Sequence, residues 1–192
     1  MRFPKKEWLL LFAVSATGCS PTDAALTPLY HRAGVPSTFA YAGGRDFQTV
    51  VVGNPFSLDK EKFETIVTDA MQGRHWGPPV RFTTKPGDNA RPNYRIVMFF
   101  DPPTPSQASA LCQDPRRLAT ERRPDKISVH AGFCVGDELQ SEVRARMGVV
   151  ASPEDPAFRS MVGAVLQTLI PPVDPHRERR FGIPLCRFPH CS

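Results

Sequence analysis

"YRIVMFFD", residues Tyr94–Asp101, is the stretch that decides the fold. Apolar residues stand at consecutive positions here instead of alternating with polar ones, so a strand would be apolar on both faces. Pro102 and Pro103 follow at once, and proline cannot donate to a ladder of strand hydrogen bonds. We therefore expect a central strand that ends at this pair of prolines.

A second strand and a helix are predicted before it. Residues 47–52 are rich in β-branched side chains and stop at Gly53-Asn54-Pro55, which is typical of a strand. Apolar residues then recur at i, i+3, i+4, i+7 and i+8, which indicates one buried helix stripe. This stripe consists of Phe63, Ile66, Val67, Ala70 and Met71. Ser57 or Asp59 would cap the helix, and Gly73 would end it. A strand–helix–strand order favours a right-handed crossover between parallel strands.

A hairpin and a second helix are predicted after it. Residues 127–134 and 139–147 both alternate, and Gly136-Asp137 supplies the turn between them. Ser152 would cap the last helix, with Pro153 at its first position. The buried stripe of this helix is Phe158, Met161, Val162, Val165, Leu166, Leu169 and Ile170.

The element order β-α-β-β-β-α predicts an α+β domain over residues 45–170. We expect two layers, a four-stranded mixed sheet with both helices on one face. Residues 74–92 are expected as a loop, and residues 104–125 as a polar segment with a helical turn at 106–111. Val50, Val52, Val97 and Phe99 would then lie on the uncovered face. The tail 171–192 is the expected cover, with loop 74–92 or another protein as alternatives.

The N-terminus has the layout of an export signal. Arg2, Lys5 and Lys6 precede an apolar run, Trp8–Val14, that is far shorter than the roughly 20 residues a membrane span needs. Small residues follow this run. We therefore expect residues 1–18 to be a removable signal peptide.

Ala16-Thr17-Gly18-Cys19 resembles the lipobox of bacterial lipoproteins. That resemblance implies cleavage before Cys19 and acylation of this cysteine, so that the chain is anchored in a membrane and faces the periplasm. Ser20 follows it in place of the aspartate that retains lipoproteins in the inner membrane, which implies the outer membrane. Residues 19–44 would then be a tether. The element order is likewise similar to that of small envelope lipoprotein domains of unknown function.

The remaining four cysteines are even in number, which in an oxidising compartment predicts two disulfides. We favour the local pairings Cys112–Cys134 and Cys186–Cys191. The alternative for the second pair is a zinc site shared with His176 and His190. We expect no cofactor and no metal.

The charge is mildly basic. The formal net charge is +5, and about +3 without residues 1–18, which permits contact with anionic lipid, an anionic envelope polymer or a partner protein but does not argue for nucleic acid. Two arginine groups are candidate anion-binding sites. These are Arg116, Arg117, Arg122 and Arg123 in the segment 104–125, and Arg177, Arg179 and Arg180 in the tail.

The chain has none of the common nucleophile, phosphate-loop or zinc-protease motifs. We therefore expect a non-catalytic binding or assembly protein of the bacterial envelope, tethered through Cys19. One alternative is a small periplasmic enzyme in which His130 acts as a base with Asp101 or a nearby arginine. Another is an accessory lipoprotein of a pilus or secretion machine.

Overall fold

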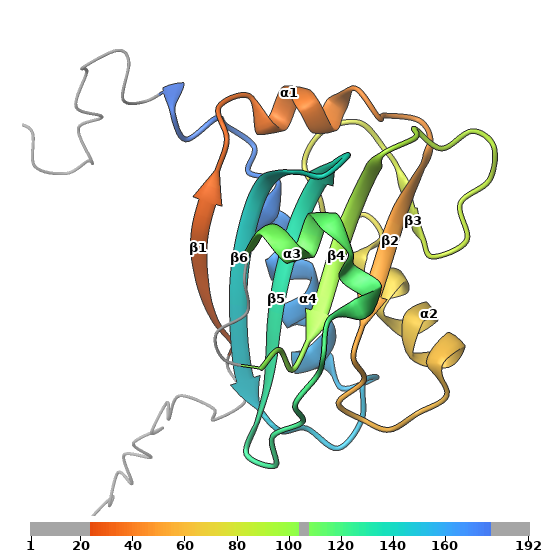
Figure 1. The fold of residues 1–192 in the computed structure, drawn as a ribbon, viewed down its shortest axis with the longest axis vertical. Helices are drawn as coiled ribbons and strands as arrows, with labels where there is room; N and C mark the ends of the chain where they lie inside the picture. Colours follow the sequence, from red (N-terminus) through yellow and green to blue (C-terminus); the bar gives the residue numbers. More distant parts are fainter. Residues whose placement is uncertain (1–23, 104–107, 178–192) are drawn as a thin grey trace, which may run out of the picture.

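A six-stranded mixed sheet organises the protein, with helices on both of its faces (Figure 1). The computed structural model describes residues 24–103 and 108–177. Across the sheet the strands lie in the order β1-β6-β5-β4-β2-β3. The strands are β1 (Ala25–His31), β2 (Asp46–Val52), β3 (Arg81–Thr83), β4 (Tyr94–Phe100), β5 (Lys126–Val135) and β6 (Glu138–Gly148). The helices are α1 (Val35–Ala40), α2 (Lys60–Met71), α3 (Ala108–Gln113) and α4 (Pro156–Leu169), with a 3-10 turn at Pro115–Arg117.

The strand pairings confirm the α+β class and the predicted topology of the central strands. β2 and β4 pair in parallel, with Val50 opposite Val97, as the helical crossover requires. β5 pairs antiparallel with β4 on one side and with β6 on the other. β4 therefore lies inside the sheet, and Ile96 to Phe100 are all buried, which explains its uninterrupted apolar run.

The prediction of four strands was wrong, because strands were missed at both edges. β1 lies within residues 19–44, which were expected to be a tether, and pairs antiparallel with β6. Most of its side chains are exposed on both faces, so it carries no alternating pattern. β3 lies within the expected loop 74–92 and has only three residues, paired in parallel with β2. α1 also lies in the expected tether, and its Phe39 is fully buried.

The predicted helices α2 and α4 pack together on one face of the sheet, as expected (Figure 1). Asp59 caps α2 by accepting the N–H of Lys62 at 3.1 Å, so the cap is Asp59 and not Ser57. The predicted start of the last helix was wrong. α4 begins at Pro156, and Asp155 caps it by accepting the N–H of Ala157 at 2.8 Å. The carboxylate three residues after Ser152 thus provides the cap.

The other face of the sheet is covered by α3 and the turn after it, which corrects the expectation that the tail would cover it. Val97 and Phe99 pack there against Leu111 and Leu118. A disulfide joins Cys112 of α3 to Cys134 of β5, the pairing that the sequence favours, with their Cα atoms 5.6 Å apart. Arg95 of β4 also donates to the carbonyl oxygen of Cys112. These contacts hold α3 across β4 and β5 (Figure 1).

The described part of the tail returns to the N-terminal strand. Asp174 accepts the N–H of Gly34 at 2.8 Å, and a ring nitrogen of His176 lies 2.6 Å from the carbonyl oxygen of His31. His31 in turn contacts the carbonyl oxygen of Thr168 in α4 at 2.7 Å. Among the helices of the described chain, none is long and apolar enough to span a bilayer.

Candidate functional site

His130 lies in the middle of β5, on the face that α3 covers. Ser128, His130 and Gly132 alternate with the apolar residues of this strand, which predicts a solvated face, but the His130 side chain is fully buried. Its Nε2 atom lies 2.5 Å from Oε1 of Glu142, a β6 residue that is also buried. The register explains the pair. His130 stands opposite Arg144, and Glu142 is the diagonal neighbour on the same face of the hairpin.

Burial lowers the pKa of His130 from its ordinary 6.5, even though the Glu142 carboxylate favours the protonated ring. The folded protein therefore binds a proton less readily at this site than the unfolded chain does. As the pH falls below 6.5, the unfolded chain gains this proton first, so stability falls with it. His130 and Glu142 form a buried polar pair, and the ring is not accessible to a substrate in this structure.

Asp101, the other group considered as a partner for His130, contacts the neighbouring backbone instead. Its Oδ1 accepts the N–H of Ser128 at 3.0 Å, while its own N–H donates to the Ser128 carbonyl oxygen. Burial raises the pKa of Asp101, against the opposing effect of Arg122 and Arg123. It fixes the end of β4 against the start of β5. The structure thus does not bring Asp101 and His130 together as an acid–base pair.

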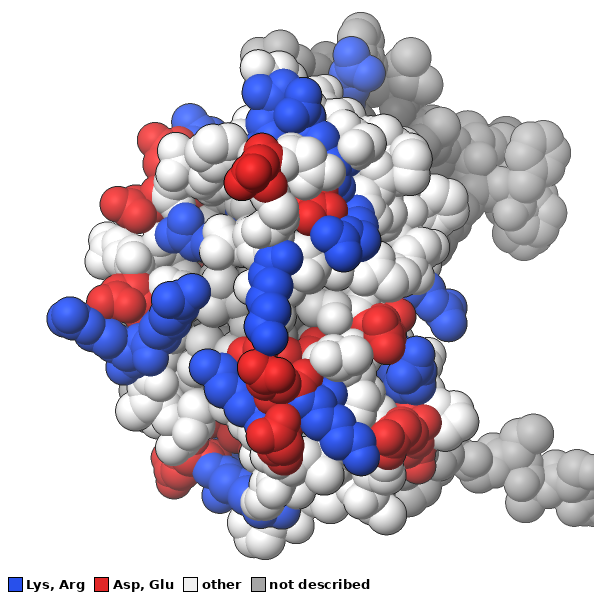
Figure 2. Space-filling model, turned by 90° about the vertical axis from the view of Figure 1, so that its right-hand side faces the viewer, with Lys and Arg blue, Asp and Glu red and all other residues white. Residues whose placement is uncertain are grey.

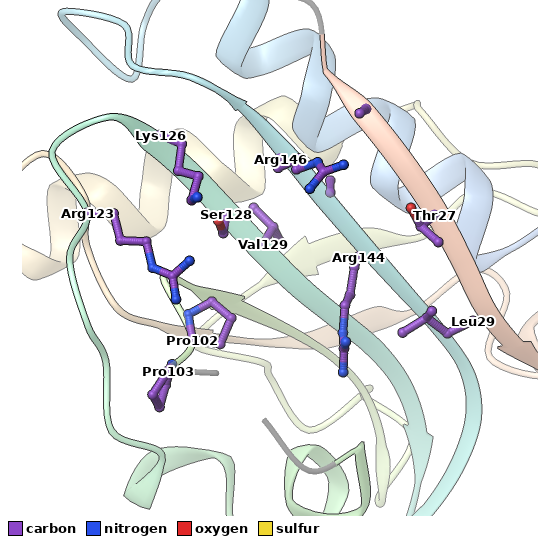
Figure 3. Close-up of a pocket in the computed structure, with 12 residues that line it drawn as sticks. Thr27, Leu29, Pro102, Pro103, Arg123, Lys126, Ser128, Val129, Arg144 and Arg146 are labelled. Atoms are coloured by element: carbon purple, nitrogen blue, oxygen red, sulfur yellow. The ribbon is translucent and has the colours of Figure 1, made fainter. Parts of the chain in front are cut away.

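A groove of about 340 Å³ opens on the same face of the sheet, beside the start of β1 (Figure 3). β1, β5 and β6 form its floor, and Pro102 and Pro103 contribute to its wall. Four cationic side chains line it, and none of its described lining residues is acidic. They are Arg123, Lys126, Arg144 and Arg146. We call this the cationic groove.

The strand register gathers these cations. Arg144 and Arg146 are two residues apart on β6, so both side chains leave the same face of the sheet. Ser128 of β5 stands opposite Arg146, and Ala25 of β1 flanks Arg146 on the other side. Arg123 arrives from the segment that precedes β5. Guanidinium and ammonium groups at such spacing bind phosphate, sulfate or carboxylate.

Three carboxylates lie near the cationic groove without lining it, and one of them is Asp101, which precedes Pro102 and whose charge interacts with that of Arg123. Asp125 lies 3.7 Å from the ammonium of Lys126, and Glu142 lies 4.0 Å from a guanidinium nitrogen of Arg144. The Glu142 carboxylate is directed mainly at His130, its closer neighbour. The side chain of Arg144 remains 48% exposed, so it can reach a ligand in the groove. These carboxylates lie beside the groove, and none of the described residues that line it is acidic.

The predicted arginine group of segment 104–125 divides in the structure, and only Arg123 lines the cationic groove. Arg117 pairs with Asp114 at 2.9 Å, and Arg122 donates to the hydroxyl of Ser57 at 2.5 Å. Arg116 is exposed on the 3-10 turn. Lys126, Arg144 and Arg146 were not among the predicted anion-binding residues, and the two arginines were considered only as neighbours of His130. Their spacing on the predicted hairpin was the available signal, but the groove needs β1 as its third strand.

The opposite edge of the sheet differs in its charges. Figure 2 shows cationic and anionic side chains interspersed over the side that carries β3 and α2. Lys85 lies 3.1 Å from Glu61, and Lys60 lies 3.8 Å from Glu64. Its cations are thus largely matched by nearby carboxylates.

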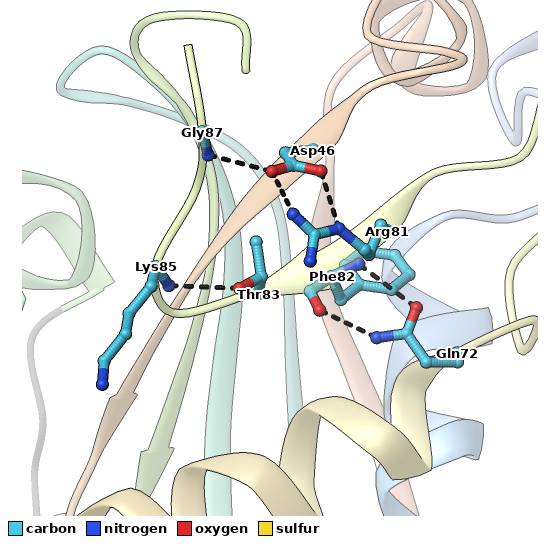
Figure 4. A network of polar contacts seen from close by, with 7 residues as sticks. All are labelled: Asp46, Gln72, Arg81, Phe82, Thr83, Lys85 and Gly87. Carbon is cyan, nitrogen blue, oxygen red and sulfur yellow. Dashed lines mark hydrogen bonds and ion pairs between the residues drawn. The ribbon is translucent and has the colours of Figure 1, made fainter. Parts of the chain in front are cut away.

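A polar network ties β3 to its neighbours at this edge (Figure 4). Two nitrogens of Arg81 donate to the two oxygens of Asp46, at 2.8 and 2.6 Å. The Arg81 guanidinium, together with the N–H of Gly87, lowers the pKa of Asp46. The amide of Gln72 bonds both the N–H and the carbonyl oxygen of Phe82. These contacts explain how a strand of three residues is held in the sheet. They also engage the polar groups of Asp46, Gln72 and Arg81 in hydrogen bonds within the protein.

Several predicted residues lie outside the described ranges. These are Cys19, Arg179, Arg180, Cys186 and Cys191. Arg177 is described and exposed at the end of the described chain. Within residues 24–103 and 108–177, no three histidine, cysteine or acidic side chains are grouped so that they could hold a metal ion.

No protein-family model and no curated protein matches the chain. Among solved structures, it resembles the PelC dodecamer from Paraburkholderia phytofirmans, at 13% identity and a TM-score of 0.42. A single-residue variant of that dodecamer matches at 12% identity and a TM-score of 0.41. Each alignment covers 76% of this chain and 97% of the other. Values this low carry no information about the activity, ligand or assembly of this chain.

Proposed function

We propose that the chain is a lipid-anchored binding protein of the bacterial envelope, which holds an anionic ligand or partner in the cationic groove and catalyses no reaction. The signal-like N-terminus and the lipobox resemblance at Ala16–Cys19 support the anchor. The Cys112–Cys134 disulfide supports an oxidising compartment such as the periplasm. By the sorting rule that Ser20 satisfies, the anchor lies in the outer membrane.

The cationic groove is the observation that carries the binding role. A concave surface lined by four cations, with no acidic residue among its described lining, attracts anions. Surface charges that serve only solubility are expected to have both signs interspersed, as they do at the β3 edge. The lining of the groove, in contrast, has cations alone. The groove is also open enough to admit a group the size of a phosphate or a sugar carboxylate.

The enzymatic alternative has less support. His130, its proposed base, is fully buried and contacts Glu142 instead of Asp101. A general base must come within hydrogen-bond reach of the proton that it removes. The buried pair is better explained as a polar contact that aligns β5 with β6.

Metabolic labelling with an alkyne fatty acid tests the anchor. Cells producing the wild-type chain are expected to yield a labelled protein in the membrane fraction, and Cys19→Ser is expected to yield none. Cys186→Ser serves as the matched control. It also replaces a cysteine by serine, but outside the lipobox, so the fatty-acid label should remain. An unlabelled wild-type chain, or label that persists in Cys19→Ser, would remove the anchor from the proposal.

A further inference from the structure

We propose that the ligand of the cationic groove is the headgroup layer of anionic phospholipid in the membrane that holds Cys19. The inference rests on the proposed lipid anchor and deepens it, because it assigns both a ligand and an orientation. The domain would lie with the start of β1 against the lipid surface, and with the β3 edge away from it.

Chain length limits how far the groove can be from the membrane. Ala25 both begins β1 and lines the groove, directly opposite Arg146. Only six peptide units separate Ala25 from Cys19. A fully extended chain spans at most about 3.6 Å per residue, so this segment reaches no further than about 20 Å. An acyl-anchored Cys19 therefore keeps the groove beside the headgroups, and the expected tether of residues 19–44 is much shorter than predicted.

The charges of the groove match such a surface. Arg123, Lys126, Arg144 and Arg146 line it, and Asp101, Asp125 and Glu142 are the nearby carboxylates. Phospholipid phosphates are anionic, and clustered basic residues bind surfaces that carry them. Electrostatic attraction decays over a Debye length of about 8 Å at physiological ionic strength. Because the link to Cys19 is short, a modest tilt of the domain toward the membrane brings the cations of the groove within this distance of the phosphates.

Exposed apolar side chains on β1 continue the same surface. Leu29 lines the groove and is 43% exposed, and Tyr30 beside it is 44% exposed. An apolar side chain beside a tyrosine, next to basic residues, suits the boundary between headgroups and acyl chains. Leu29 and Tyr30 would enter this boundary while the cations contact phosphates.

Vesicle co-sedimentation of the chain without residues 1–19 tests the groove separately from the anchor. This chain retains every described strand and helix. We expect it to sediment with vesicles of phosphatidylcholine mixed with phosphatidylglycerol, and to stay in solution with phosphatidylcholine vesicles. Raising the salt concentration should weaken sedimentation, because the attraction is electrostatic.

Charge removal at the groove gives the sharper comparison. Lys126→Gln with Arg146→Gln is expected to lower the partition coefficient roughly 25-fold, about fivefold per basic residue. Lys60→Gln with Lys85→Gln removes the same charge from the opposite edge, and should change the coefficient less than about twofold. Circular dichroism checks that both double variants are folded.

Three outcomes would overturn the inference: equal binding to both kinds of vesicle, equal losses in the two double variants, or binding to a soluble anionic polysaccharide with none to anionic vesicles. Fatty-acid labelling separates this failure from failure of the proposed function. A labelled wild-type chain whose groove ignores anionic vesicles keeps the anchor and loses the headgroup site. An unlabelled chain loses the anchor, and with it the argument from chain length.

Discussion

Removal of the Cys112–Cys134 disulfide should destabilise the domain by about 3 kcal/mol. The bond closes a loop of 22 residues in sequence separation. In the chain-entropy description, a cross-link that closes a loop of this length lowers the entropy of the unfolded chain by about 11 cal/mol/K. At 25 °C this corresponds to about 3 kcal/mol of stability. A domain of ordinary stability has about 5 to 15 kcal/mol in total, so the change is large. The perturbation is the double variant Cys112→Ala, Cys134→Ala.

The loss should also be uneven across the fold. Besides the disulfide, Leu111 of α3 and Leu118 after the 3-10 turn pack over the sheet against Val97 and Phe99. These apolar contacts remain in the variant, so α3 should stay docked but open more often. Amide exchange in α3 is expected to accelerate more than amide exchange in the strands β4 and β5 beneath it.

Urea unfolding of the chain without residues 1–19 measures the total, followed by tryptophan fluorescence and by circular dichroism. Both sulfurs belong to fully buried residues, so a reductant should act on the native protein only slowly, and rapidly once urea unfolds it. A loss below about 1 kcal/mol would refute the reasoning, since it would mean that the bond closes no costly loop in the unfolded chain. Equal acceleration of exchange in α3 and in β4 would refute the uneven loss.

Two further predictions concern the buried His130 and two glycines with positive φ. Because burial lowers the pKa of His130 below 6.5, the free energy of unfolding should fall as the pH drops just below 6.5, by up to ~1.4 kcal/mol per pH unit, and His130→Gln should flatten that slope in urea titrations; an unchanged slope would contradict the assignment. Gly53 has a φ of 80°, and an added Cβ would collide with the Phe100 carbonyl oxygen, whereas Gly73, at 66°, has open space. Gly53→Ala should therefore cost about 3 kcal/mol and Gly73→Ala about 1 kcal/mol in thermal or urea unfolding, and equal costs would exclude the collision.

Periodic burial explains which elements the sequence could predict. α2 and α4 each bury one side against the sheet, so their apolar residues recur at helical spacing. β4 is buried on both faces and carries an uninterrupted apolar run, and Ile127, Val129 and Ala131 alternate because one face of β5 meets the helices. The Cys112–Cys134 pairing could be predicted for a related reason, since the two cysteines are close in sequence and the N-terminus has the layout of an export signal.

The cationic groove and the buried His130–Glu142 pair could not be predicted in this way. Arg123 and Arg146 line the same groove because the segment before β5 lies near β6, with β1 on the other side of β6. No local sequence pattern encodes that arrangement. The pair could not be read from the strand pattern, because Ser128 and Gly132, the residues on either side of His130 on the same face, are small or polar, and yet His130 is fully buried.

The sequence by itself determined the α+β class, the central strands and the two long helices, because each depends on side chains that are close along the chain. Only the tertiary structure decided the edge strands, the cover over the second face and the groove beside Ala25. Those features depend on pairing between segments far apart in sequence, and an edge strand such as β1 has too little burial to mark its residues with a period.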